Sequence, residues 1–194
     1  VHAPSGLARW LADPRDLVIY HCSIGWSRAR ALLRHLRCRR FVRYHNITPP
    51  EFFYGWSRDH VRACAAGRAA LPQLLALGAE RWLACSPYSR DELVALGVDP
   101  AHVCMLAPFN RIERLFDTPP DFDLIDRYGG GASRWLTVGR LAPNKNHTTV
   151  LDAFAVYRRE YDADARLLVV GKHDRRLAAY TRSLRERSAA LGLG

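Results

Sequence analysis

The sequence predicts an α/β protein with two parallel sheets. Short apolar runs alternate with amphipathic helical stretches, a pattern typical of parallel strands joined by helical crossovers. The alternation stops over a stretch rich in proline, aspartate and glycine and then starts again, which indicates two units and a connector. We therefore expect a first unit at residues 1–108, a connector at 109–132 and a second unit at 133–194.

The first unit should contain four buried strands, with helices between them and on both faces of the sheet. Continuous apolar runs place the strands at 16–21, 41–45, 81–85 and 102–106. Helical periodicity or helix-start residues place helices at 27–36, at 51–76 with breaks near Gly67 and Pro72, and at 90–96, capped by Ser89 and closed by Gly97.

The second unit repeats the alternation only twice. We expect strands at 134–139 and 166–170, and helices at 147–160 and 175–191. Two strands make a poor independent sheet. Because the chain also begins with Val1, we expect it to be a piece of a longer protein, with both units incomplete.

The charge is strongly basic, with a net value of +10 and a pI near 9.9. Seven arginines lie in one stretch without an acidic residue: Arg28, Arg30, Arg34, Arg37, Arg39, Arg40 and Arg43. Such a balance favours nucleic acid, an anionic membrane or a phosphorylated ligand as a partner. A compositional bias towards arginine, alanine, glycine and leucine explains it equally well.

The helix at 27–36 carries much of this charge on one face. Ala29, Leu32, Leu33 and Leu36 share the apolar face, and Arg30, Arg34 and Arg37 fall opposite. Such a helix either has a solvated basic face or rests on anionic lipid.

The five cysteines are odd in number, widely spaced and form no C-x-x-C pair. They are interpreted as buried hydrophobic residues in a reducing compartment, which favours the cytoplasm. No apolar run is long enough to span a membrane, and no ligand cluster suggests a metal. Motifs of dinucleotide-dependent redox enzymes, ATPases, zinc proteases and serine hydrolases are missing as well.

One junction has the layout of an anion site. An apolar strand ends at Gly139, Arg140 and Lys145 flank a short loop, and Asn146 is placed to cap the following helix. Free amides and the positive end of the helix dipole both favour an anion there. Two cations suggest a nucleoside diphosphate, although two exposed basic residues in a surface loop would give the same sequence.

Two further positions follow expected strands. His45 comes at the carboxyl end of a strand, the edge where open α/β sheets bind ligands, and His21 occupies the same place on the preceding strand. Either ring could contact a substrate or could be structural. Gly171 also follows a strand and would allow a ligand to approach closely.

Several segments together resemble family 4 retaining glycosyltransferases. The residues Val138-Gly-Arg-Leu-Ala-Pro-Asn-Lys-Asn-His147, with Ala165-Arg-Leu-Leu-Val-Val-Gly171 downstream, resemble the start of that family's nucleotide-sugar-binding domain. Upstream, Tyr20-His-Cys-Ser-Ile-Gly25, Tyr44-His-Asn-Ile-Thr-Pro49 and Ala84-Cys-Ser-Pro-Tyr-Ser89 resemble the later part of the acceptor domain. The segments follow one another in the family's order.

This resemblance implies the GT-B fold, with two Rossmann-like domains, and a sugar transferred from a nucleotide-sugar donor to a glycan or lipid-linked acceptor with retention. Arg140 and Lys145 would hold the donor diphosphate without a metal or cofactor, and Gly139, Asn146 and Gly171 would lie nearby. His45 would line the cleft near the transferred sugar, as a contact and candidate catalytic residue. The implied setting is polysaccharide or glycoconjugate synthesis in the cytoplasm, peripheral at the inner face of the membrane.

The chain departs from the family pattern in two places. The family's glycine-rich loop would precede Val1, and its paired glutamates, seven residues apart, would follow Gly194; no such pair occurs here. The fragment alone is therefore not expected to turn over. The competing hypothesis is a basic module that binds nucleic acid or an anionic membrane without catalysis, but no base-stacking motif accompanies the arginines, so nucleic acid is not expected as a partner.

Overall fold

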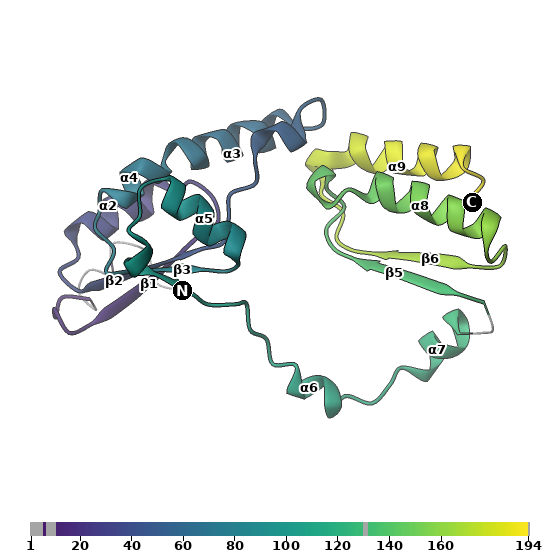
Figure 1. Ribbon diagram of the computed structural model, residues 1–194, viewed down its shortest axis with the longest axis horizontal. Helices are drawn as coiled ribbons and strands as arrows, with labels where there is room; N and C mark the ends of the chain where they lie inside the picture. Colours follow the sequence, from purple (N-terminus) through teal and green to yellow (C-terminus); the bar gives the residue numbers. More distant parts are fainter. Residues whose placement is uncertain (1–5, 7–10, 130–131, 194) are drawn as a thin grey trace. The chain divides into compact units, whose positions relative to one another are not determined.

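A computed structural model describes residue 6, residues 11–129 and residues 132–193 (Figure 1). The chain divides into two compact units. The first contains residues 1–51 and 60–110, and the second contains residues 52–59 and 111–194. The short segment 52–59 thus interrupts the first unit in sequence and clusters with the second.

The first unit is built on a four-stranded parallel sheet in the order β1-β2-β3-β4. Its strands are β1 (Leu17–Cys22), β2 (Arg39–Tyr44), β3 (Arg81–Ala84) and β4 (Val103–Met105), each close to its predicted range. Between them lie α2 (Ser27–His35), η1 (Pro50–Phe53), α3 (Arg58–Ala69), α4 (Leu71–Leu75), α5 (Pro87–Ala95) and η2 (Pro100–His102). Because spatial order equals chain order, each crossover joins neighbouring strands.

Burial follows the position of each strand in the sheet. The consecutive residues Trp82, Leu83 and Ala84 of the central strand β3 are all buried, so both of its faces are covered. The edge strand β1 alternates instead, with Leu17 and Ile19 exposed.

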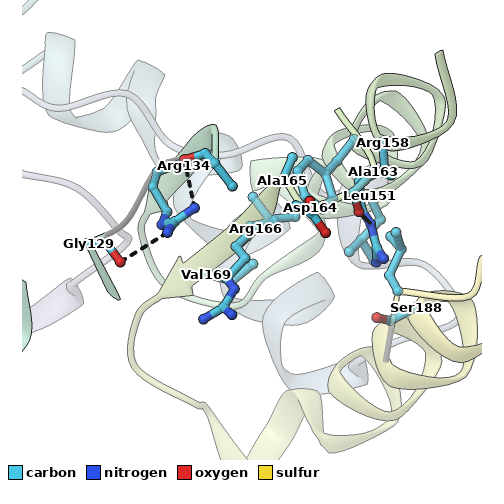
Figure 2. Close-up of a pocket in the computed structure, with 14 residues that line it drawn as sticks. Gly129, Arg134, Leu151, Arg158, Ala163, Asp164, Ala165, Arg166, Val169 and Ser188 are labelled. Carbon is cyan, nitrogen blue, oxygen red and sulfur yellow. Dashed lines mark hydrogen bonds between the residues drawn. The ribbon is translucent and has the colours of Figure 1, made fainter. Parts of the chain in front are cut away.

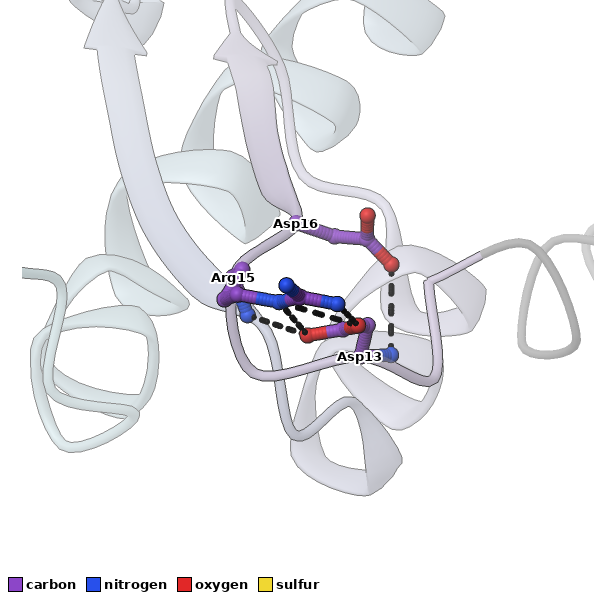
Figure 3. Close-up of polar contacts among 3 residues, drawn as sticks. All are labelled: Asp13, Arg15 and Asp16. Atoms are coloured by element: carbon purple, nitrogen blue, oxygen red, sulfur yellow. Dashed lines mark hydrogen bonds and ion pairs between the residues drawn. The ribbon is translucent and has the colours of Figure 1, made fainter.

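A tight polar turn starts β1 (Figure 3). The Asp13 amide donates to the Asp16 carboxylate at 3.2 Å, and the Asp16 amide donates to the Asp13 carbonyl at 3.0 Å. Arg15 closes the turn with an ion pair to the Asp13 carboxylate at 2.6 Å. These bonds join residues that are at most three positions apart, so the turn before β1 is held by local contacts.

The basic helix α2 buries Ala29 and Leu33, and Leu36 follows it in the core, as the apolar periodicity predicts. Arg34 and Arg37 are exposed, as expected. The prediction that Arg30 belongs to the same solvent face is wrong, because Arg30 is half-buried and its guanidinium donates to the Gln73 side chain.

The predicted break at Gly67 does not occur. Gly67 lies inside α3, and the chain breaks after Ala69, with Pro72 in the first turn of α4. A Cβ on Gly67 would lie 2.8 Å from the Gly25 amide nitrogen. The glycine is therefore a contact residue that lets α3 approach the loop after β1.

The start of α5 also differs from its prediction. Ser86, and not Ser89, is the N-cap: its hydroxyl accepts from the Ser89 amide at 3.2 Å. Ser89 is buried in the first turn. Gly97 ends the helix region with a φ of +98°, as expected from a closing glycine.

The stretch expected to be an irregular connector contains two short helices, α6 (Glu113–Phe116) and α7 (Phe122–Tyr128). Asp121 caps α7 by accepting from the Leu124 amide at 3.1 Å. Proline and aspartate thus mark helix boundaries here in place of continuous coil.

The second unit carries a two-stranded parallel sheet of β5 (Arg134–Val138) and β6 (Arg166–Val170). Between and after the strands come η3 (Pro143–Lys145), α8 (His147–Glu160), η4 (Arg175–Leu177) and α9 (Ala178–Ala190), in close agreement with prediction. Figure 1 shows α8 and α9 over one face of this sheet.

Aromatic packing joins that covered face to α8. The Trp135 ring lies 5.6 Å from Phe154 and 5.0 Å from Tyr157, measured between centroids. On the opposite face, Leu136 and Val138 are 66% and 72% exposed. Within the described part of this unit, the two helices therefore cover one face of the sheet and leave the other face exposed.

Cys22, Cys38 and Cys64 are buried, as expected of small hydrophobic residues, but Cys85 is only partly buried and Cys104 is exposed on β4. All five are free thiols. Within the described ranges, no helix is both long and apolar enough to cross a bilayer.

We predict that Gly67→Ala lowers the free energy of unfolding. Alanine would gain about 1 kcal/mol in helix propensity, but overpacking against the Gly25 backbone costs about 1–3 kcal/mol. Urea unfolding measures the balance. As a control, Ala65→Gly on the exposed face of α3 should lose only the propensity term; a Gly67→Ala protein more stable than wild type would contradict the contact.

Candidate functional site

The ends of β5 and β6 are locked together by their backbones. The Gly139 amide donates to the Val170 carbonyl at 2.9 Å, and the Leu141 amide donates to the Lys172 carbonyl at 3.2 Å. A Cβ on Gly171 would fall 1.7 Å from the Gly139 carbonyl oxygen. The two loops therefore run against each other at the carboxyl edge of the sheet, and Gly171 is required by this contact.

Arg140 follows this contact between the two loops, and other side chains hold its guanidinium only loosely. Its side chain is 42% exposed, and its Nη1 lies 4.0 Å from Asp174 Oδ2, at the limit of an ion pair. The same carboxylate binds Arg176 more closely, at 2.8 Å for Nη2 and 3.1 Å for Nε. Because Asp174 is already engaged, the Arg140 guanidinium is the more available charge for an anion.

Lys145 ends η3 and is exposed, and no ion pair to it is found among the described residues. Asn146 follows in the left-handed conformation, with φ 52° and ψ 41°. The expected cap is not made: the Asn146 Oδ1 accepts from the Thr149 hydroxyl at 3.0 Å and from no backbone amide of α8. The first amides of α8 consequently have no side-chain cap beside Lys145, which favours an anion there.

The first residue of α8, His147, is buried behind this loop. Burial is the main reason that its pKa lies below the usual histidine range, and the charge of Lys145 acts in the same direction. The ring lies 6.4 Å from Tyr180, which in turn packs edge-on against Trp56 at 5.2 Å. An aromatic cluster that includes the segment 52–59 thus supports the start of α8.

In the first unit, three side chains meet at the carboxyl edge of β1, β2 and β3. His21 lies near the end of β1, His45 directly follows β2, and Cys85 directly follows β3. His21 Nδ1 lies 2.9 Å from His45 Nε2, and Cys85 Sγ lies 3.7 Å from His45 Nδ1. The rings of the two histidines stack with their centroids 5.0 Å apart.

The surroundings of His45 favour the neutral form of its ring. Partial burial is the largest cause that lowers its pKa, followed by the proximity of His21 and of Arg43. Arg43 is buried, and its guanidinium donates to the carbonyls of Leu106 and Ala107. A neutral ring can use one nitrogen as a donor and the other as an acceptor.

A buried network fixes the loop that follows His45. The Tyr44 hydroxyl donates to Glu92 at 2.6 Å, and Arg68 pairs with the same carboxylate at 2.7 Å. Arg68 also donates to the Ile47 carbonyl at 2.8 Å, and the Ile47 amide donates to the Tyr44 hydroxyl at 3.3 Å. These bonds hold Asn46 in a left-handed turn with φ 64°.

A hollow of about 760 Å³ lies elsewhere, at the amino ends of β5 and β6 (Figure 2). Arg134, Arg158 and Arg166 line it, among apolar side chains of α8 and β6. Arg134 donates to the carbonyls of Gly129 and Ala132, at 3.1 and 2.7 Å, and Arg158 donates to that of Ala163 at 3.3 Å. Two of its three cations therefore bind the protein's own backbone, and the hollow is not at the edge that carries Arg140.

The structure thus brings Gly139, Arg140 and Gly171 together and places Lys145 and Asn146 on the next turn of the same loop. His45 belongs to the other unit. Sequence analysis missed two partners: Asp174 beside Arg140, and Cys85 beside His45. Both follow strands directly or closely, which is the one signal that could have found them. No group of three or more potential metal ligands occurs in the described part of the chain.

Comparison with solved structures shows which proteins share this fold. The fold matches the crystal structure of HepE from Anabaena in complex with UDP and glucose, with a TM-score of 0.62, 20% identity, and coverage of 86% of this chain and 42% of that one. It matches a glycosyltransferase from Rickettsia africae (TM-score 0.62, 13% identity, 98% and 46% covered). It also matches a UDP-forming α,α-trehalose-phosphate synthase from Burkholderia vietnamiensis, with a TM-score of 0.64, 12% identity, and coverage of 97% of this chain and 46% of that one.

No protein-family model and no curated protein matches the sequence. The chain spans less than half the length of the structures that it resembles. At these identities the comparison establishes the fold: an α/β chain with two parallel sheets of the GT-B type, as the sequence predicts.

We predict that Gly171→Ala disrupts the loop contact while Gly139→Ala is tolerated. The first substitution places a methyl group on the Gly139 carbonyl, whereas a Cβ on Gly139 meets nothing within 4 Å. Gly171→Ala should lower the melting temperature by several degrees, consistent with a cost of about 1–3 kcal/mol. Thermal unfolding of both proteins gives the comparison, and equal melting temperatures would contradict the contact between Gly171 and the Gly139 carbonyl.

We also predict an acid-sensitive contribution from His147. Its pKa is lowered on folding, so the unfolded chain binds the proton more readily, and stability falls as the pH drops below the unfolded value of 6.5. His147→Gln should show a shallower loss of stability between pH 7.5 and pH 5 in urea unfolding. His173→Gln, at an exposed position of the same unit, is the control and should keep the wild-type slope.

Proposed function

We propose that this chain is part of a glycosyltransferase that takes its sugar from a nucleotide-sugar donor. The observation that carries the proposal is the carboxyl edge of the second unit, where Arg140 and Lys145 flank a loop that leads to the uncapped start of α8. The similar fold of HepE, which was solved with UDP and glucose, supports a uridine diphosphate donor.

The two cations have distinct tasks in this proposal. The planar guanidinium of Arg140 can donate two parallel hydrogen bonds to phosphate oxygens, and the Lys145 ammonium adds a compact charge. Together they stabilise the negative charge that grows on the diphosphate as the bond to the sugar breaks. Two cations beside the loop can do this work without a metal ion, so the proposal does not require a divalent metal for donor binding. Gly139, Asn146 and Gly171 shape the backbone around the phosphates.

The finer assignments rest on the resemblance of the sequence to family 4. We propose transfer of a hexose with retention to a glycan or lipid-linked acceptor, in polysaccharide or glycoconjugate synthesis. In this proposal His45 contacts the substrates from the first unit, because its ring is exposed at the carboxyl edge of the sheet and its pKa is lowered, which favours the neutral form.

A peripheral location at the inner face of the membrane fits the surface of α2. Arg28, Arg34 and Arg37 are exposed, and Ile24 and Trp26, just before the helix, are 46% and 48% exposed. Arginines beside an exposed tryptophan suit an anionic lipid surface. Flotation with vesicles should recover the protein when anionic lipid is present; equal recovery with neutral vesicles would contradict the electrostatic contribution.

The donor site is tested by nucleotide binding. We predict that UDP binds the chain in the presence of EDTA, and that Arg140→Ala and Lys145→Ala each weaken binding roughly ten- to a hundredfold, the loss of a charged hydrogen bond of about 1.5–3 kcal/mol. Isothermal titration calorimetry measures the affinity. Arg159→Ala is the matched control, because Arg159 is an exposed arginine of the same unit that pairs with Glu160.

Two results would contradict the proposal. Unchanged affinity for UDP in the Arg140→Ala and Lys145→Ala proteins would remove the site. Binding to single- or double-stranded nucleic acid that weakens steeply with salt, with no preference for nucleoside diphosphates, would favour the alternative of a basic binding module.

A further inference from the structure

The hydrogen bonds around His45 define how its ring can be used. In the sheet register, His21 pairs with Arg43, and His45 lies two residues beyond Arg43 on the same face of β2. The ladder continues past the strand, since the His45 amide donates to the Cys22 carbonyl at 2.9 Å. The backbone therefore fixes the two imidazoles side by side, and their 2.9 Å contact is a consequence of the register.

Cys85 reaches the other ring nitrogen of His45 for the same reason. Tyr44 pairs with Ala84 in the register of β2 and β3, so the residues that follow them are neighbours. The Cys85 sulfur lies 3.7 Å from His45 Nδ1, a distance typical of a weak hydrogen bond to sulfur. His45 thus has a close partner at Nε2 and a weak, displaceable partner at Nδ1.

The chemistry of the Cys85 thiol determines which nitrogen atoms of His45 and His21 carry a proton. A thiol is a weak donor and sulfur is a poor acceptor, whereas an unprotonated imidazole nitrogen is a good acceptor, so the thiol donates to Nδ1. Neutral His45 then carries its proton on Nε2 and donates it to His21 Nδ1. His21 keeps its own proton on Nε2, and that exposed ring can donate to water.

We propose that His21 is a positioning residue that holds His45 in the tautomer with an unprotonated Nδ1, so that His45 accepts a hydrogen bond from a ligand hydroxyl. This inference rests on the proposed function for the identity of the ligand, a sugar with free hydroxyl groups. A ligand hydroxyl replaces the weak Cys85 contact at Nδ1, while the bond to His21 stays in place. Phosphate oxygens that carry no proton are excluded as partners of this nitrogen, because both atoms would be acceptors.

The tautomer is measured on the ligand-free chain by long-range proton–nitrogen correlation NMR at pH 8. Wild-type His45 should show an unprotonated Nδ1 and a protonated Nε2. His21→Ala should convert this to a mixture of tautomers. His21→Asn should restore the wild-type pattern, because the asparagine amide oxygen can take the place of the His21 Nδ1 acceptor. His35→Ala, an exposed histidine of α2, is the control and should change nothing.

Ligand choice is measured in the same spectra with glucose and with sulfate as probes, because sulfate carries no proton at pH 8 and can only accept hydrogen bonds. The His45 Nδ1 resonance should move with glucose and stay fixed with sulfate. A protonated Nδ1 in wild type, no effect of His21→Ala, or a resonance that moves with sulfate or with neither probe overturns the inference.

Calorimetry with UDP separates this test from that of the proposed function. UDP binding that depends on Arg140, together with the wrong His45 tautomer, overturns only the role of His21. The expected tautomer and the glucose response without UDP binding support the role of His21 and overturn the donor-site proposal.

Discussion

Parallel pairing is the constraint on which the candidate site of each unit depends. In each sheet all neighbouring strands run in the same direction, so their carboxyl ends coincide and the residues after them become neighbours. His45 and Cys85 meet because Tyr44 pairs with Ala84, and Gly139 meets Gly171 because Val138 pairs with Val170. An antiparallel arrangement would place successive strand ends at opposite edges and separate each of these pairs.

Rigid support lies directly behind the candidate site of each unit. In the first unit, Glu92 binds both Tyr44 and Arg68, so one carboxylate from α5 fixes the end of β2 and a residue of α3. In the second unit, backbone bonds between the loops and the buried His147 ring do the same for the start of α8. Loops held by a scaffold in this way can keep exposed side chains in a defined geometry, which is what recognition of a ligand requires.

The order and type of the main strands and helices follow from the sequence because they depend on local patterns. The strand 166–170 and the helix 147–160 fall at their predicted residues, since continuous apolar runs and helical periodicity are strong over those ranges. The errors come from tertiary contacts that leave no local trace. The sequence predicts a helix break at Gly67, whereas the structure shows Gly67 inside α3 in contact with Gly25. The sequence also places Arg30 on the solvent face, whereas its guanidinium donates a hydrogen bond to Gln73.

In the candidate site, too, some features could be predicted from the sequence and others depend on tertiary contacts. Arg140 and His45 could be proposed because they stand next to strand ends, and Lys145 because it stands just before a helix start; polar residues are informative at both kinds of position. The side chain of Asn146 could not be predicted, because its choice of the Thr149 hydroxyl over a backbone amide depends on a left-handed φ. The partners at His45 Nε2 and Nδ1 come from separate strands, and only the register reveals them.

The basic residues differ in how closely a carboxylate holds them, and this difference supports the position of the proposed donor site. Most of the charge in this chain is arginine, but several arginines bind nearby carboxylates at hydrogen-bond distance: Arg39 with Glu80, Arg68 with Glu92, Arg176 with Asp174, and Arg187 with Asp152. Arg140 faces a carboxylate that Arg176 already holds, and Lys145 is exposed at the start of an uncapped helix. Net charge attracts anions to the whole surface, whereas a loosely paired arginine and an exposed lysine beside the uncapped start of α8 supply the local positive charge that the proposed diphosphate site requires.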